Sequence, residues 1–166
     1  MSWSQTTIRL PPKSQGCHLI DHEIERQVPD LRKYKIGMAN IFLQHTSASL
    51  MLNENADPGT YSRIYYEHGV FSSGIDIDNT LVFTDVRKDM NMALDKIAPE
   101  NLPYIHTDEG PDDMPGHVKS GIVGVSLNIP ITNGRLNTGT WQGIYLCEHR
   151  RHNSGRKIVV TLQGQT

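Results

Sequence analysis

Strand-like apolar segments recur along this chain and crowd into its last third, and they constrain the fold most. These segments are residues 5–10, 37–44, 123–130, 140–147 and 158–162. The turn-forming residues Thr132-Asn133-Gly134 follow the third of them. Since strands outnumber helices and follow one another closely, we predict an α+β fold on a largely antiparallel sheet or sandwich.

Two helices are predicted between the strands. A short helix from Asp21 to Val28 has Ile20, Ile24 and Val28 on one face, and Asp21 can cap it. A clearer helix begins at Asp85 and ends before a proline. Its predicted apolar stripe consists of Val86, Met90, Ala93, Leu94 and Ile97.

Length and charge exclude several classes of protein. A chain of 166 residues is long enough for one domain with a real core, so we assign residues 1–166 to a single domain. The net charge of −2 gives no electrostatic reason to bind nucleic acid. No apolar run is long enough for a membrane helix, and no signal peptide is evident, so a cytoplasmic location is expected. Cys17 and Cys147 are expected to be buried thiols in a reducing compartment.

Residues 106–119 carry the strongest sign of chemistry. They combine two histidines, four acids and a lysine with two prolines and two glycines. So polar a segment buries too little apolar surface to be ordered by itself, which indicates a bound metal or phosphorylated ligand. His106 and His117 can converge only if the bend at Gly110-Pro111 folds the segment back. The alternative is a solvated acidic loop in which Asp113 caps a helix.

A second polar stretch follows the strand at 37–44. It starts with His45-Thr46-Ser47 and continues through Asn53-Glu54-Asn55 to Asp57. A side chain at a strand end is held rigidly, which suits a metal ligand or a general base such as His45. A histidine that is hydrogen-bonded to the backbone is the alternative interpretation.

A third stretch, residues 134–143, is followed by Glu148. Trp141 lies between polar neighbours and can stack on a ring, or it can be a core residue of a hairpin. Glu148 at a strand end can be a ligand or a base, and a surface salt bridge is the alternative. The sequence contains no nucleophile-elbow, Walker A, dinucleotide-binding or zincin motif.

In this order, the motifs resemble those of the YjbQ family, also called the secondary thiamine-phosphate synthase family. The resemblance covers nearly the whole chain and includes residues 45–50, 53–58, 106–120, 129–130, 139–144 and Glu148. It implies a small β-sandwich with a few flanking helices that assembles as a homotrimer. It also implies a pocket lined by the matched His, Asp and Glu residues, with a bound metal.

We therefore expect these residues to form one site for a small phosphorylated substrate. The expected ligands of a divalent metal, Zn²⁺ or Mg²⁺, are His45, His106, Asp112 and His117. The expected catalytic residues are His45, Asp57, His117 and Glu148. The expected substrate-binding residues are Ser47, Asn53, Asn55, Lys119, Thr140, Trp141 and Gln142.

Three functions remain open from the sequence. The resemblance implies a thiamine-phosphate synthase, which joins hydroxymethylpyrimidine pyrophosphate to thiazole phosphate and releases pyrophosphate. Such a leaving group needs neutralisation by a metal or by a cation such as Lys119. Three histidines fit a transition metal better than Mg²⁺, so a metal-dependent hydrolase is an alternative. The third possibility is a non-catalytic trimer that binds a metal or a metabolite.

One segment departs from the family pattern. Residues 59–84 separate Pro58 from Asp85, two positions that almost adjoin in that pattern. A tolerated surface insertion is one interpretation, because a longer loop costs little closure entropy. A retained intron is the other, since codons for its first and last residues can spell splice sites. A transcript that joins the Pro58 and Asp85 codons directly would support the intron.

Overall fold

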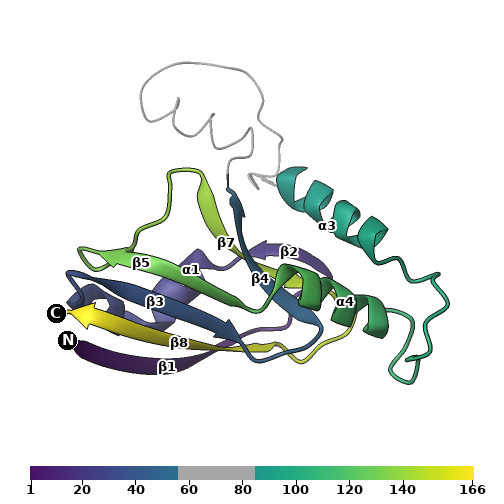
Figure 1. Ribbon diagram of the computed structural model, residues 1–166, viewed down its shortest axis with the longest axis horizontal. Helices are drawn as coiled ribbons and strands as arrows, with labels where there is room; N and C mark the ends of the chain where they lie inside the picture. Colours follow the sequence, from purple (N-terminus) through teal and green to yellow (C-terminus); the bar gives the residue numbers. More distant parts are fainter. Residues whose placement is uncertain (56–84) are drawn as a thin grey trace, which may run out of the picture.

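Two antiparallel β-sheets form the framework of the computed structural model, which describes residues 1–55 and 85–166 (Figure 1). The larger sheet has the order β1 (Ser2–Leu10), β8 (Arg156–Gln165), β3 (Ile36–Leu43), β5 (Ser126–Thr132) and β6 (Arg135–Leu136). The smaller sheet has the order β2 (Gly16–Leu19), β7 (Gln142–Glu148) and β4 (Ala48–Glu54). The predicted α+β class with antiparallel strands is confirmed.

Three α-helices and one short 3₁₀-helix complete the described part of the chain. They are α1 (Asp21–Gln27), η1 (Pro29–Lys33), α3 (Asp85–Ile97) and α4 (Asp113–Val123). Helix α4 packs against β4, and α3 packs against β2 and α4. In Figure 1, α3 and α4 lie together beside the smaller sheet, on the side where residues 98–112 connect them.

The main core lies between the two sheets and is closed by α1 and η1. Alternate residues of the central strands point into it, so that β8 contributes Ile158, Val160 and Leu162, each nearly inaccessible to solvent. Ile24 of α1 and Leu31 of η1 belong to the same buried cluster. This burial is the main source of stabilisation, since apolar area removed from water contributes about 25 cal/mol per Å².

A smaller apolar cluster lies between the three-stranded sheet and α3. Its buried members are Cys17, Leu94, Tyr145 and Cys147. Leu94 and the partly buried Met90 attach α3 to the sheet, whereas Ile97, which was predicted to share their stripe, is exposed. The predicted helix is therefore confirmed, and its predicted buried stripe is only partly correct.

Several predicted boundaries shift in the structure. Val123, predicted to begin a strand, is the last residue of α4, and the strand begins only at Ser126. Asp21 does not cap α1, because its carboxylate accepts the backbone N–H of Ile144 on β7 instead. The predicted turn is present, with Asn133 and Gly134 at φ angles of 50° and 77°.

Two further predictions concern membrane helices and the segment 59–84. No helix among the described residues is long and apolar enough to cross a membrane. The proposed insertion at 59–84 lies outside the described residues, as does Asp57. The single-domain assignment and the insertion remain predictions.

Candidate metal centre

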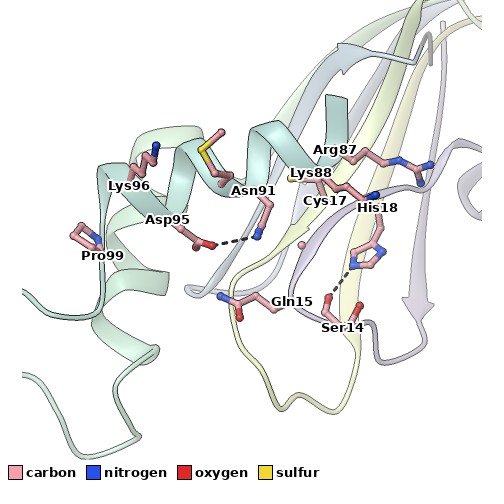
Figure 2. Close-up of a pocket in the computed structure, with 12 residues that line it drawn as sticks. Ser14, Gln15, Cys17, His18, Arg87, Lys88, Asn91, Asp95, Lys96 and Pro99 are labelled. Carbon is pink, nitrogen blue, oxygen red and sulfur yellow. Dashed lines mark hydrogen bonds between the residues drawn. The ribbon is translucent and has the colours of Figure 1, made fainter. Parts of the chain in front are cut away.

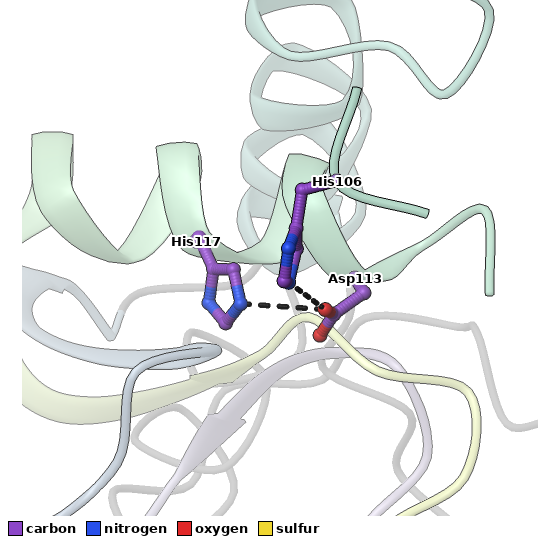
Figure 3. A group of neighbouring side chains, drawn as sticks. All are labelled: His106, Asp113 and His117. Atoms are coloured by element: carbon purple, nitrogen blue, oxygen red, sulfur yellow. Dashed lines mark ion pairs between the residues drawn. The ribbon is translucent and has the colours of Figure 1, made fainter. Parts of the chain in front are cut away.

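Two residues of α4 and one residue of the loop before it, Asp113, His117 and His106, form a compact group that could hold a metal ion, which we call the metal group. Asp113 and His117 are four residues apart on α4, so their side chains share one face of the helix. His106 joins them because the loop turns back at Gly110, whose φ of 105° favours glycine. Figure 3 shows both imidazole rings directed at the Asp113 carboxylate.

The geometry of this group suits a small cation. Asp113 Oδ2 lies 2.9 Å from Nε2 of His106 and 3.4 Å from Nε2 of His117. The three potential ligand atoms all lie within 4.8 Å of one another. Asp113 is only 1% exposed, whereas the side chains of His106 and His117 are 52% and 30% exposed. The carboxylate is therefore held in the protein, and the histidines leave one side of the group open to solvent.

The hydrogen bonds of His117 leave its Nε2 available as a ligand. Nδ1 of His117 lies 2.9 Å from the carbonyl oxygen of Thr46 and 3.2 Å from Oγ of Ser47. Because a carbonyl only accepts hydrogen bonds, Nδ1 carries the proton and Nε2 of the neutral ring carries a lone pair. A backbone carbonyl behind the ring is the usual arrangement for a metal-binding histidine.

Arg150 positions the carboxylates at the start of α4. Its guanidinium donates to Oδ1 of Asp113, and its Nε lies 3.4 Å from Oδ2 of Asp112. Asp112 also accepts the backbone N–H of Arg151 at 2.8 Å. Burial raises the pKa of Asp112, but these donors and charges outweigh it, so the pKa lies below its usual value. Asp112, predicted as a metal ligand, thus contacts Arg150 and Arg151, and Asp113 is the carboxylate that lies beside the two histidines.

His45 lies outside this group, beside a buried ion pair. Arg156 binds Glu148 through two bonds of 2.7 and 2.6 Å, and both side chains are almost completely buried. Nε2 of His45 lies 3.0 Å from Nη1 of Arg156, and Nδ1 accepts the backbone N–H of Ser47. Burial and the charge of Arg156 lower the pKa of His45. The salt bridge considered for Glu148 exists, but it is buried and not at the surface.

The register of the smaller sheet separates the predicted substrate-binding residues from the histidines. Ala48 pairs with Glu148 at one end of β4 and β7, and Glu54 pairs with Gln142 at the other. The two ends are about 20 Å apart, since a strand rises about 3.4 Å per residue. The predicted substrate-binding residues at the second end are Asn53, Asn55, Thr140, Trp141 and Gln142. Within one copy of the chain, the structure does not bring them to the metal group.

Of the other predicted substrate-binding residues, Ser47 lies beside the metal group and the ammonium of Lys119 does not. Ser47 is buried beside His117, as the expected single site requires. Lys119 is buried and binds Oδ1 of Asp95 on α3 at 2.5 Å, so its ammonium is not directed at the metal group. The catalytic and substrate-binding roles given to these residues remain predictions.

A cavity adjoins the metal group. It has a volume of about 980 Å³ and is lined in part by His45, Thr46 and His117. Phe42 and Gly121 contribute apolar surface on its far sides. His45 and His117 therefore line the same cavity.

Sequence reasoning missed the roles of Asp113 and Arg150. Asp113 was interpreted as a helix cap, although its spacing of four from His117 is that of two residues on one helix face. Nothing in the local sequence around Arg150 indicates its partners, because they lie 37 and 38 residues away in the chain. Thr46 contributes only its backbone carbonyl, which no side-chain pattern reveals.

Comparison with known proteins finds a matching family model and several similar proteins. The family model described as "UPF0047 protein YjbQ-like" matches residues 6–66 and 71–165, which include much of the segment 59–84. UPF0047 protein YjbQ of Escherichia coli O157:H7 is 43% identical over 163 residues, covering 98% of this chain and 99% of that protein. A UPF0047 protein of Synechocystis is 37% identical and covers 97% of this chain and 92% of that protein.

Solved structures share the fold. A YbjQ-like protein of unknown function from Sulfolobus solfataricus superposes with a TM-score of 0.72 at 20% identity, covering 99% of both chains. A yjbq/upf0047 family protein from Clostridium acetobutylicum gives a TM-score of 0.64 at 27% identity, covering 96% of this chain and 99% of that one.

Proposed function

This chain belongs to the YjbQ-like UPF0047 family, and we propose that it is a metal-assisted enzyme that acts on a small phosphorylated substrate. In this proposal His106, Asp113 and His117 hold a divalent ion. The reaction displaces a phosphate or pyrophosphate group, and the acceptor is either thiazole phosphate, as in a thiamine-phosphate synthase, or water, as in a hydrolase.

One observation carries the proposal. Oδ2 of Asp113 is buried and has no aligned hydrogen bond from any described residue, and it lies 2.9 Å and 3.4 Å from Nε2 of His106 and His117. A buried carboxylate oxygen without a partner costs free energy, and a lone pair on Nε2 of His117 beside it adds repulsion. A cation between the three atoms would remove both costs.

The donor set indicates which ion fits. Two imidazoles and one carboxylate match a transition metal such as Zn²⁺ better than Mg²⁺, which prefers oxygen ligands. Three protein ligands leave coordination positions open, as in catalytic sites. When bound there, the ion would supply Lewis acidity toward a phosphoryl oxygen or a water molecule.

The described cations near the site support a role for the ion as the electrophile. Arg150, Arg156 and Lys119 are each bound to carboxylates, of Asp113, Glu148 and Asp95 respectively. Negative charge on a leaving group would therefore be neutralised by the ion more readily than by these side chains. His45 lines the adjoining cavity, and burial and the charge of Arg156 lower its pKa. Because its two ring nitrogens face the backbone N–H of Ser47 and the guanidinium of Arg156, we assign it to the wall of the cavity and not to proton transfer.

The first test is the metal content of the purified protein by elemental mass spectrometry. We expect about one transition-metal ion per chain in the wild type, as for other sites with three protein ligands. The variants His117→Ala and Asp113→Asn should lose the ion but keep the circular dichroism spectrum of the folded protein. His22→Ala, an exposed histidine on α1, is the matched control and should keep the ion. Equal metal content in all four proteins would refute the site.

The second test separates the three functions. The metal-loaded protein is incubated with hydroxymethylpyrimidine pyrophosphate, with and without thiazole phosphate, and pyrophosphate release is measured. Release that requires thiazole phosphate supports the synthase, and release without it supports the hydrolase. A metal-loaded protein that is inactive in both assays and on simple phosphate esters would leave only a metal-binding role, and the enzyme proposal would fail.

We also propose that the chain assembles as a homotrimer through the outer face of the larger sheet. Trp3, Ile36, Met38 and Phe42 on this face are 41–64% exposed. The polar side chains between them on β1, β3, β5 and β8 are uncharged, and Arg9 and Lys157 lie only at one end. Exposed apolar side chains that lie together, with the charges only at one end, are typical of a surface that binds another protein surface.

A further inference from the structure

The two cysteines of the chain lie side by side on neighbouring strands, 130 residues apart in sequence. Cys17 of β2 pairs directly with Cys147 of β7, and their Sγ atoms are 3.4 Å apart. Both thiols are free. A disulfide needs an S–S distance of about 2.05 Å, so the two sulfur atoms have to approach by only about 1.4 Å.

The position of the pair in the β-ladder also suits a disulfide. The backbone N–H of Ile20 donates to the carbonyl of Ile144, which makes these two residues a hydrogen-bonded pair of the ladder. Since hydrogen-bonded and non-hydrogen-bonded pairs alternate, the pair Cys17–Cys147 is three steps further and is non-hydrogen-bonded. Cα atoms of such pairs are about 4.5 Å apart, which falls within the range that disulfides tolerate.

The two thiols differ in their access to solvent. Cys17 lines a cavity of about 840 Å³ between the start of β2 and the helix α3 (Figure 2), and it is 7% exposed. Cys147 is 1% exposed and does not line this cavity. A reagent in the cavity can therefore reach Cys17 first, and Cys147 only through Cys17.

The surroundings of Cys17 favour its thiolate. The hydrogen bond between the two thiols lowers the pKa of Cys17 and outweighs the effect of burial. The same hydrogen bond and burial raise the pKa of Cys147. Lys88 and Lys96 of α3 line the cavity, whereas the charge of Asp95 is partly compensated by Lys119. The cavity is therefore suited to an anionic reagent.

We propose that Cys17 and Cys147 form a redox-active dithiol that small anionic disulfides oxidise. The Cys17 thiolate attacks one sulfur of the disulfide, forms a mixed disulfide and releases one thiolate. Cys147 then gives up its proton and attacks the Cys17 sulfur, and the second thiolate leaves. The protein loses two electrons and two protons, and the reagent is reduced to two thiols. The proposal is independent of the metal centre, because it uses no residue of that group.

The test uses glutathione disulfide as the probe and the whole chain under native conditions. Intact-mass measurements should show that the wild type loses two hydrogens, that no glutathione adduct accumulates, and that dithiothreitol reverses the change. The variant Cys147→Ala should instead accumulate a stable adduct of one glutathione on Cys17. The matched variant Cys17→Ala should react at least about tenfold more slowly than Cys147→Ala, because its remaining thiol is buried.

Denatured samples provide the control for access. In denaturant, both single variants should form the adduct at similar rates, which shows that the difference belongs to the folded state. Circular dichroism establishes that each variant is folded before it is compared. A wild type that keeps both thiols, or a Cys17→Ala variant that reacts as fast as Cys147→Ala while folded, would overturn the proposal. Peptide mapping of the oxidised wild type must also find Cys17 joined to Cys147 in one chain and not between two chains.

Discussion

Asp113 and His117 show how single atoms decide what a cluster of polar residues can do. Oδ1 of Asp113 is bound by Arg150, which leaves Oδ2 for the group with His106. The carbonyl of Thr46 fixes the proton of His117 on Nδ1, which leaves Nε2 for the same group. Oδ2 of Asp113 and Nε2 of His117 are thus each oriented by a partner outside the metal group.

His149, a buried histidine two residues after Cys147, gives a prediction for pH dependence. Burial, together with the charge of Lys119, lowers the pKa of His149 to about 4, from 6.5 in the unfolded chain. Between pH 6.5 and pH 4 the unfolded chain therefore binds a proton that the folded protein does not bind. The free energy of unfolding falls as the pH falls through this window, by about 3 kcal/mol in total, since one pKa unit corresponds to about 1.4 kcal/mol.

The variant His149→Gln tests this prediction. Glutamine does not titrate, and it can still hydrogen-bond to Oγ of Ser49. Urea unfolding of the wild type and the variant at several pH values should give a stability difference that changes between pH 6.5 and pH 4. His18 and His45, whose pKa values are also lowered, titrate in both proteins and cancel in the comparison. A difference that is constant with pH would contradict the prediction.

Among the elements, the central strands β3 and β8 require glycine where they pair, whereas α4 contains a glycine, Gly121, that it does not require. Gly37 of β3 and Gly164 of β8 face each other in the register, and each backbone approaches the other closely. A Cβ on Gly164 would lie 2.2 Å from the backbone oxygen of Ile36. Outside the neighbouring backbone of α4 itself, no described atom lies within 4 Å of the position that a Cβ on Gly121 would take. The paired strands β3 and β8 thus require glycine at positions 37 and 164, whereas α4 does not require glycine at position 121.

This contrast predicts opposite effects of the same substitution. Gly164→Ala should lower the free energy of unfolding by about 1–3 kcal/mol, because backbone atoms have to move to make room. Gly121→Ala should raise it by about 0.5–1 kcal/mol, because alanine stabilises a helix interior relative to glycine. Denaturant unfolding of both variants and the wild type measures the two changes. Equal losses in both variants would show that the close approach of the strands has no influence.

At the scale of the whole molecule, two features concern the assembly of several copies: the exposed outer face of the larger sheet, and the distance between the two ends of the smaller sheet. The residues predicted to bind substrate lie at the far end of β4 and β7 from the histidines. Assembly of several copies would cover the exposed apolar side chains of β1 and β3 and can place surfaces of different copies next to one another.

The proposed homotrimer is tested by one charge in that face. Met38→Lys places a charge at the centre of β3, where burial against another copy would be costly. Light scattering after size-exclusion chromatography should find a trimer for the wild type and a smaller species for the variant. Ile97→Lys, at an exposed apolar residue of α3 away from the sheet, is the control and should leave the trimer intact. A monomeric wild type would refute the assembly.

The sequence by itself determined the class of the fold and the segment that carries the metal group. Strand periodicity is local information, because alternate side chains must face the core whatever the strand pairs with, and β1, β3, β7 and β8 therefore lie close to their predicted ranges. The composition of residues 106–119 likewise identified His106 and His117, since no apolar burial could order such a segment.

Only the tertiary structure decided which residues meet. Asp113, and not Asp112, lies beside the two histidines, because the turn of α4 and Arg150 from a distant strand end orient the two adjacent carboxylates differently. His45 turns to Arg156, and Cys17 meets Cys147, through strand pairings that join residues more than a hundred positions apart. Such contacts depend on register and sheet order, and these are properties of the whole packed chain that no local pattern contains.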